Sequence, residues 1–313
     1  MSAIGFEQER RAASEGALLS QRGELGALII TGKDRQSWLN GLVTCDLAAP
    51  KVGQGVYGLA VGKTGKILAE LWIVIADDHL ALALPAARIE LIREHFDRHV
   101  IMEDVEIEAD ATRSWIVAAG PKARELVGAA RSLGADAAMV DFTGRGDTAA
   151  ILPPIGALEA TRDALLAGLG GAGALAGDEA WEALRVAWGV PRFGVDFDEQ
   201  NLPQEPSLER IAVSFAKGCY LGQEAVFMLE KRGHAKKRLM RLAVEGTDDV
   251  ARGAEITLPD GTVVGDVTSR AESPEGGFAA LGYVKWKHAQ AGAELLIAGR
   301  KARAIGLAAE PFR

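Results

Sequence analysis

The chain has 313 residues, of which 48% are hydrophobic and 25% are charged, and its formal net charge is -8. This length exceeds the size at which a single hydrophobic core usually stops growing, so we expect two or three domains. The composition excludes a disordered or fibrous protein. The negative charge argues against a protein that coats nucleic acid non-specifically, because the phosphate backbone favours a basic face.

The sequence shows no targeting or membrane segment. The N-terminal stretch MSAIGFEQERRAASEGALL lacks a basic start followed by an apolar run, so it does not predict a secretory signal. The longest apolar stretch, LAELWIVIADDHLALALP, is interrupted by Glu70, Asp77 and Asp78 and is too short to span a bilayer. We therefore expect a cytoplasmic protein with no membrane contact.

The chain has two cysteines, Cys45 and Cys219. They cannot form a CxxC metal site, and a reducing compartment argues against a disulfide between them, so we expect no bound metal. Cys45 is predicted to be buried and inert, and Cys219 to be a free thiol.

The first predicted elements form a meander with two helices. A strand ends at Thr31 and a short helix follows, with Asp34 in its first turn, where a carboxylate suits the helix dipole. Three strands joined by turns at 62–65 and 77–78 come next. Apolar residues spaced by three and four then predict an amphipathic helix within 86–100.

The next predicted elements again have strands followed by a helix. Strands within 105–109 and 114–120 precede a helix within 121–133. The glycine-rich stretch 168–177 lacks the spacing of a dinucleotide-binding loop and is interpreted as a flexible connection. A helix over 178–188 is predicted to stop at a glycine followed by a proline.

After Arg238 the pattern changes to short apolar strands separated by glycine, which is typical of a small antiparallel barrel or sandwich. The predicted class is α+β. We expect a first α+β segment at 1–112, a second at 113–237 and an all-β domain at 238–313, and leave open an exchange of elements between the first two.

The stretch KGCYLGQE, residues 217–224, carries the strongest chemical signal. A cationic neighbour such as Lys217 favours the thiolate of Cys219, and glycines let the backbone approach a ligand closely. Gln223 and Glu224 add an amide and a carboxylate that can recognise a ligand or accept a proton. The alternative is structural: the glycines form turns and Cys219 fills a small hole.

A basic run follows between Met228 and Arg241. Its cations are Lys231, Arg232, Lys236, Lys237, Arg238 and Arg241, against the single acid Glu230. One interpretation is a solvated charged surface. The other is an anion site for phosphates or a polyglutamate tail, or a weak RNA contact over Lys231 to Arg241.

Residues 201–239 closely resemble the YgfZ family of folate-binding proteins, whose mark is K-G-C-aromatic-x-G-Q-E followed by R-G and basic residues. Residues 182–196 and the segment TGKDRQSWLNGLVTCDL resemble that family and the related glycine-cleavage T-proteins. The resemblance covers essentially the whole chain. It implies two α+β domains and a C-terminal β-barrel around a central cavity that holds tetrahydrofolate or a derivative. It also implies iron-sulfur client enzymes as partners and a role in tRNA modification.

The resemblance assigns site residues in this chain. Cys219 and Lys217 are the expected catalytic residues. The expected cofactor-binding residues are Gly218, Tyr220, Gly222, Gln223, Glu224, Arg185, Arg232 and Glu70. Glu70 lies near an acidic position of the T-protein pattern, and strand alternation leaves it facing either the cavity or solvent. Trp181 and Trp188 share a helix face and are interpreted as core residues.

Two departures limit the resemblance. Met228 stands where many family members have arginine, and Ala187 stands where T-proteins have the glutamate that serves pterin recognition. The second departure disfavours a folate-dependent aminomethyltransferase of the T-protein type. The sequence leaves open whether the protein is a one-carbon transferase-like enzyme or a docking module without turnover.

Overall fold

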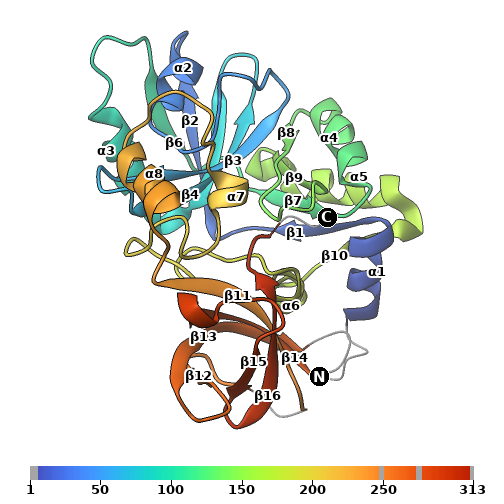
Figure 1. Ribbon diagram of the computed structural model, residues 1–313. Coiled ribbons are helices and arrows are strands. Elements are labelled where there is room, and N and C mark those ends of the chain that lie inside the picture. The colour runs from blue at the N-terminus through green and yellow to red at the C-terminus, as the bar shows by residue number, and fades with distance from the viewer. Residues whose placement is uncertain (1–5, 247–249, 273–276, 311–313) are drawn as a thin grey trace.

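The computed structural model describes residues 6–246, 250–272 and 277–310. Figure 1 shows two sheets with their helices in the upper half of the molecule and a barrel below them, with α6 (Asp178–Trp188) between the halves. In the part of the chain that is described, no helix is both long and apolar enough to cross a bilayer.

The N-terminal sheet has the strand order β3-β4-β5-β2-β6, with antiparallel neighbours throughout. Its strands are β2 (Leu25–Thr31), β3 (Gly55–Val61), β4 (Ile67–Ile75), β5 (Leu80–Pro85) and β6 (Glu106–Asp110). Its helices are α2 (Arg35–Asn40), the 3-10 turn η2 (Ala86–Arg88) and α3 (Ile89–Asp97). The predicted meander and both predicted helices are confirmed, and α3 buries Ile92 and Phe96 as its spacing requires.

The second sheet has the order β10-β1-β7-β9-β8. Its strands are β1 (Ala17–Gln21), β7 (Ile116–Ala119), β8 (Asp136–Met139), β9 (Thr148–Leu152) and β10 (Gly173–Leu175). The helices beside it are α1 (Glu7–Glu15), α4 (Ala123–Ser132), η3 (Ile155–Ala157), α5 (Leu158–Leu169) and η4 (Gly170–Ala172). A strand from the start of the chain therefore lies between strands that come about 100 and 155 residues later, as the register of β1 with β7 and β10 records.

The interpretation of 168–177 as a flexible connection is wrong for part of the stretch. Residues 173–175 form β10, which pairs parallel to β1 from Ala17↔Gly173 to Leu19↔Leu175. Ala174 is buried. The order comes from backbone hydrogen bonds to a distant strand, which a local composition rich in glycine does not reveal.

The helix predicted over 178–188 is confirmed as α6. It ends at Gly189, whose φ of 80° places it in the left-handed region where glycine is favoured. Two further helices, α7 (Glu209–Ala212) and α8 (Gln223–Arg232), follow along an extended crossing segment. On the barrel side of α6, Val186 packs with Leu239, Leu281 and Tyr283.

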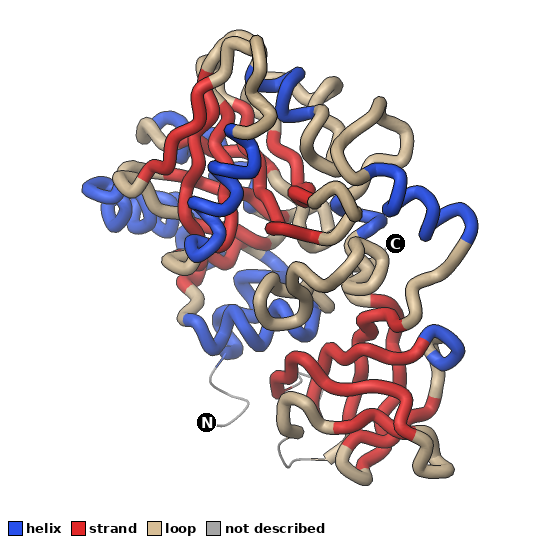
Figure 2. The backbone as a smooth tube through the Cα atoms, turned by 90° about the vertical axis from the view of Figure 1, so that its left-hand side faces the viewer, coloured by secondary structure: helices blue, strands red, loops and turns tan. Residues whose placement is uncertain are grey.

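The C-terminal strands close a barrel in the order β11-β14-β13-β12-β15-β16, which confirms the predicted fold class. They are β11 (Lys237–Val244), β12 (Glu255–Thr257), β13 (Val263–Glu272), β14 (Phe278–Lys285), β15 (Glu294–Ile297) and β16 (Arg300–Leu307). The 3-10 turn η5 (Trp286–His288) follows β14. In Figure 2 the barrel forms a separate body below the sheets.

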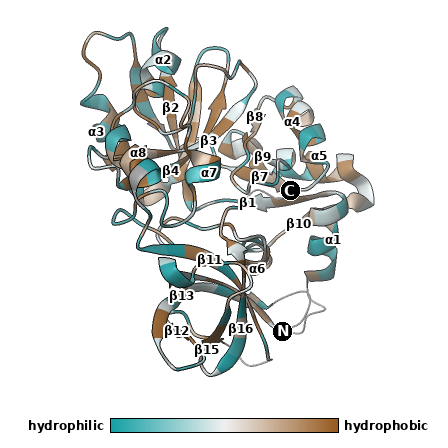
Figure 3. Cartoon of the chain, in the orientation of Figure 1, coloured by the Kyte–Doolittle hydropathy of each residue, from teal (hydrophilic) through white to brown (hydrophobic). Residues whose placement is uncertain are grey.

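One apolar core joins the upper parts of the molecule. It contains buried residues of β3 and β4, of β7 and β9, and of α6. Strands β3 and β4 are mainly brown, the apolar end of the scale, in Figure 3. Full burial of one such Leu or Ile side chain contributes about 1.5 to 3 kcal/mol, so this shared core holds the two sheets and α6 together and fixes the walls of the cavity between them.

Candidate functional site

A cavity of about 450 Å³ lies where the turn between β1 and β2, strand β4 and helix α6 converge. The loop 190–195 closes one side and residues 85–88 another. Its volume falls in the range of small-molecule sites, about 300 to 1,000 Å³. Among the residues that line it are Arg22, Glu70, Trp72, Phe142, Trp181 and Phe193.

Aromatic rings form the walls of this cavity. Trp72 stacks on Phe142, with ring centroids 4.3 Å apart and an interplanar angle of 15°. The ring of Trp181 lies 6.4 Å from that of Phe142, and the guanidinium of Arg88 lies 5.0 Å above the ring of Phe193. Such walls suit a flat ring, because aromatic pairs prefer stacked or edge-on contact.

Glu70 supplies the carboxyl group of the cavity. One of its oxygens accepts a hydrogen bond of 3.1 Å from the Tyr57 hydroxyl, and the other accepts one of 3.1 Å from the backbone N–H of Phe193. Burial raises the pKa of this carboxyl group, and the two hydrogen bonds oppose that rise. Of the two orientations left open by strand alternation, the side chain takes the one toward the cavity.

Two buried donors in the cavity have no hydrogen-bond partner in the described part of the protein. They are Nε of Arg22 and Nε1 of Trp72, and both side chains are more than nine-tenths buried. The Arg22 guanidinium lies 4.9 Å above the Trp181 ring, and burial lowers its pKa. Buried donors without acceptors are rare and point to an acceptor supplied by a ligand or by water. Neither residue was predicted, because a lone arginine and a strand tryptophan carry no sequence signal.

Arg185 also borders the cavity, but its hydrogen bonds are used within the protein. Nε and one terminal nitrogen bind the carboxylate of Glu182, and the same terminal nitrogen donates to Ser269 at 2.8 Å. The other terminal nitrogen donates to the carbonyl of Val190 and to Asp196, at 3.0 and 2.8 Å. A guanidinium has five N–H donors, and all five are engaged. Arg185 therefore joins α6 to the loop 190–196 and to the barrel, and has no donor left for a cofactor.

The cysteine loop lies apart from this cavity. None of residues 217–224, all of which are described, is among those that line it. Cys219 and Gly218 are exposed, whereas Cys45 is buried and the pKa of its thiol is raised to about 12 by burial. The structure therefore leaves Cys219 accessible to a partner at the surface.

Lys217 directs its hydrogen bonds away from this thiol. Its ammonium group donates to the carbonyl oxygens of Asn40, Val43 and Cys45, at 2.5, 2.9 and 2.6 Å. An ammonium has three N–H donors, so none is left for the Cys219 sulfur. The lysine holds the loop after α2 against the cysteine loop, and its catalytic role stays a prediction.

Of the remaining motif residues, some are buried in the protein and others lie at its surface. The Tyr220 ring is buried under the Lys217 ammonium, 5.2 Å away, and burial raises the pKa of its hydroxyl to about 12. Gly222 precedes α8 in the left-handed region, Gln223 is half-buried and Glu224 is exposed. Arg232 ends α8, and its side chain lies outside the described part of the structure.

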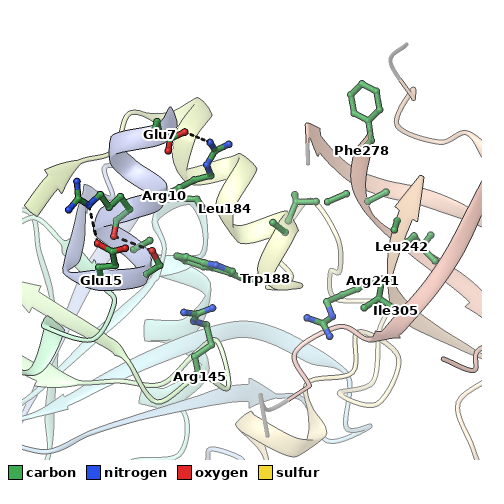
Figure 4. A pocket seen from close by; sticks show the side chains of 18 residues that line it. Glu7, Arg10, Glu15, Arg145, Leu184, Trp188, Arg241, Leu242, Phe278 and Ile305 are labelled. Atoms are coloured by element: carbon green, nitrogen blue, oxygen red, sulfur yellow. Dashed lines mark hydrogen bonds and ion pairs between the residues drawn. The ribbon is translucent and has the colours of Figure 1, made fainter. Parts of the chain in front are cut away.

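A second cavity, of about 790 Å³, lies between α1, the end of α6 and the barrel (Figure 4). Ala187 and Trp188 line it, and the Arg145 guanidinium lies 4.8 Å above the Trp188 ring. Ala187 does not line the Glu70 cavity. The position at which T-proteins have their pterin-recognising glutamate therefore opens toward a different space in this chain.

In the described ranges no group of three or more His, Cys, Asp and Glu side chains is placed to hold a metal ion. The candidate site is therefore the Glu70 cavity, together with a separate exposed thiol.

Comparison with known proteins first defines the class. A family model of the GCVT N-terminal domain matches residues 3–147, and one of the glycine cleavage T-protein C-terminal barrel domain matches residues 237–312. The crystal structure of glycine cleavage system aminomethyltransferase T from Bartonella henselae has a TM-score of 0.82 at 19% identity, and the likeness covers 99% of this chain and 91% of that one. The chain therefore has the glycine cleavage T-protein fold.

Its relatives then narrow the assignment. The tRNA-modifying protein YgfZ of Vibrio vulnificus strain CMCP6 is 29% identical over 224 residues, which are 70% of this chain and 68% of the relative. That of strain YJ016 is 28% identical over the same shares. Together with the two family models, these relatives support the YgfZ family within the GcvT-like superfamily.

Proposed function

We propose that this protein binds tetrahydrofolate or a derivative in the Glu70 cavity and supports iron-sulfur enzymes and tRNA modification in the cytoplasm. The observation that carries the proposal is the combination of a buried carboxyl group with two buried, unmatched donors between aromatic walls. Membership of a family whose relatives are named tRNA-modifying proteins supports the second half of the proposal.

The residues of the cavity fit a pterin. A pterin is flat and carries donors and acceptors on one edge, so Glu70 can accept from it while Arg22 and Trp72 donate to it. Arg88 and Arg192 also line the cavity and can meet the carboxylates of a folate tail. When bound, tetrahydrofolate supplies a carrier for one-carbon units.

Cys219 acts in this proposal as an exposed thiol toward a client enzyme and not on the folate in the Glu70 cavity. Its exposure and its absence from the lining of that cavity support this division. The same facts favour a docking or hand-over role as the second candidate over a one-carbon transferase. An aminomethyltransferase of the T-protein type is further disfavoured, because Ala187 cannot replace a carboxylate and lines the other cavity.

Calorimetric titration with tetrahydrofolate and its 5-formyl analogue tests the proposal. We expect saturable binding to the native protein and to Cys219→Ala. Glu70→Gln removes a charged acceptor worth about 1.5 to 3 kcal/mol, so its affinity should be about 10 to 100 times lower. Cys219→Ala should nevertheless fail to restore a client enzyme in cells that lack the protein. Absence of folate binding to the native protein would refute the cavity assignment, and full restoration by Cys219→Ala would refute the role of the thiol.

A further inference from the structure

The basic run that the sequence suggests does not form one surface. Arg238 is buried and forms an ion pair with Glu209 at 2.5 Å. Arg241 lines the cavity between α6 and the barrel. The ammonium of Lys231 lies 5.4 Å above the ring of Phe227, on α8. Of the described cations in this run, Lys231 is exposed on α8, whereas Lys236 and Lys237 lie at the start of the barrel strands.

Lys236 and Lys237 meet a second basic segment from elsewhere in the chain. In the register of β11 with β14, Lys237 lies opposite Lys285, and the backbone N–H of Trp286 donates to the carbonyl of Lys236 at 2.9 Å. The ends of these two strands thus form one edge of the barrel. We call it the barrel-edge patch and define it by six residues: His234, Lys236, Lys237, Lys285, Trp286 and Lys287.

The barrel-edge patch is rich in lysine. Four lysines lie within it, and in the described residues none of them forms an ion pair with a carboxylate. Lys285 donates to the carbonyl of Val263 at 2.9 Å, and the Lys237 ammonium lies 4.1 Å above the Tyr283 ring. In a chain with a net charge of -8, this is a local positive field that attracts a polyanion.

The barrel-edge patch also presents an exposed aromatic platform. The rings of His234 and Trp286 are stacked, with centroids 4.8 Å apart and an interplanar angle of 7°. Trp286 is 40% exposed, and its backbone N–H donates to the carbonyl of Lys236 on the barrel side. A site for single-stranded nucleic acid needs two parts. One is a set of cations along the phosphate backbone, and the other is a flat ring on which a base stacks.

We propose that the barrel-edge patch binds an unpaired stretch of RNA. An acidic protein segment would satisfy the lysines but would not use the stacked rings, whereas a base can extend the stack. The proposal depends on the proposed function only in preferring RNA to DNA. It does not depend on the Glu70 cavity, so failure of folate binding and failure of this surface are separate results.

The experiment is fluorescence anisotropy with a labelled single-stranded RNA of about 12 nucleotides, at salt concentrations from about 50 to 200 mM. The double variant Lys236→Glu/Lys287→Glu should bind at least about tenfold more weakly. Its slope of log affinity against log salt should be smaller by about 1.4, since each phosphate contact contributes about 0.7. Trp286→Ala should also lower the affinity about tenfold, through lost stacking.

The matched control is Lys33→Glu/Lys301→Glu, which changes the net charge equally at two exposed lysines outside the barrel-edge patch. It should change the affinity less than about twofold at the higher salt, where the general field is screened. Failure of the native protein to bind RNA, or equal losses in both double variants, would overturn the proposal. So would tighter binding of single-stranded DNA of the same sequence. If polyglutamate displaces the RNA, and if Trp286→Ala binds RNA as tightly as the native protein does, the surface is a site for an acidic protein segment.

Discussion

Two glycines of the cysteine motif, Gly218 and Gly222, meet different surroundings. Gly222 has a φ of 77°, and a Cβ atom there would lie 2.2 Å from the carbonyl oxygen of Gly62. A Cβ atom at Gly218 would meet nothing within 4 Å, and its φ is not in the left-handed region. We predict that Gly222→Ala destabilises the protein by at least about 2 kcal/mol, through backbone strain and the displaced 62–65 turn.

The matched variant Gly218→Ala should change the free energy of unfolding by less than about 0.5 kcal/mol. Urea unfolding of both variants measures the difference. If both variants change the free energy of unfolding equally, the 62–65 turn can move to admit a Cβ atom with little loss of stability. Gly222 would then have another role in the motif.

Sequence reasoning at this scale found the residues with a motif and missed those without one. Cys219 was predicted as a free thiol because a reducing compartment argues against a disulfide, and as a site residue because its motif is specific. Glu70 was predicted with two orientations, because strand alternation does not say which face of the sheet is covered. Arg22 and Trp72 could not be found, because their role comes from unmatched donors in a cavity that only the tertiary fold assembles. For Lys217, sequence adjacency to Cys219 does not reveal its three carbonyl acceptors from residues 40–45.

At the scale of elements, the side chain of Arg185 makes polar contacts from α6 to two other parts of the fold. Arg185 binds Asp196 and Ser269, so it joins α6 to the loop that walls the cavity and to β13 of the barrel. Removal of one partner from a buried ion pair costs about 3 to 5 kcal/mol, because the other charge remains buried. We predict a loss of this size for Arg185→Leu in urea unfolding, because Asp196 would lose its cation.

The control is Arg98→Leu, which removes an exposed pair with Glu94 near the end of α3. It should change the free energy of unfolding by less than about 0.5 kcal/mol. A small loss for Arg185→Leu, similar to that of Arg98→Leu, would show that α6 stays in place without its guanidinium. The shape of the Glu70 cavity would then not depend on the Arg185–Asp196 ion pair.

The elements that were predicted correctly are those with local signals. The meander over β3 to β5 has alternation and turns, and α6 has helical spacing with a glycine at its end. β10 was missed because its three residues carry no pattern and take their order from β1, about 155 residues earlier, as the register records. A parallel partner that far away in the sequence leaves no local trace.

At the scale of the whole molecule, the two sheets are linked by a charged contact as well as by their shared core. His79, in the turn between β4 and β5, binds Asp136 of β8 through Nε2 at 2.9 Å and Asp78 through Nδ1 at 2.7 Å. Arg113 also binds Asp136. The hydrogen bond to Asp136 raises the pKa of His79, and burial opposes this rise.

This contact predicts a pH dependence of stability. Because the pKa of His79 is higher in the folded protein than the ordinary value near 6.5, its stabilising effect is fully present below about pH 6.5. It is lost as the pH rises through the folded-state pKa. Between about pH 6 and pH 9 the native protein should lose about 1 kcal/mol or less of unfolding free energy that His79→Gln does not lose.

The measurement is urea unfolding at several pH values for the native protein, His79→Gln and a control, His288→Gln, in η5 on the barrel. The difference between native protein and His79→Gln should shrink as the pH rises, because protonated His79 bridges two carboxylates of different parts of the fold. His288→Gln should follow the native curve. If the native and His79→Gln curves stay parallel over the whole range, the His79 contact adds no pH-sensitive link between the two sheets.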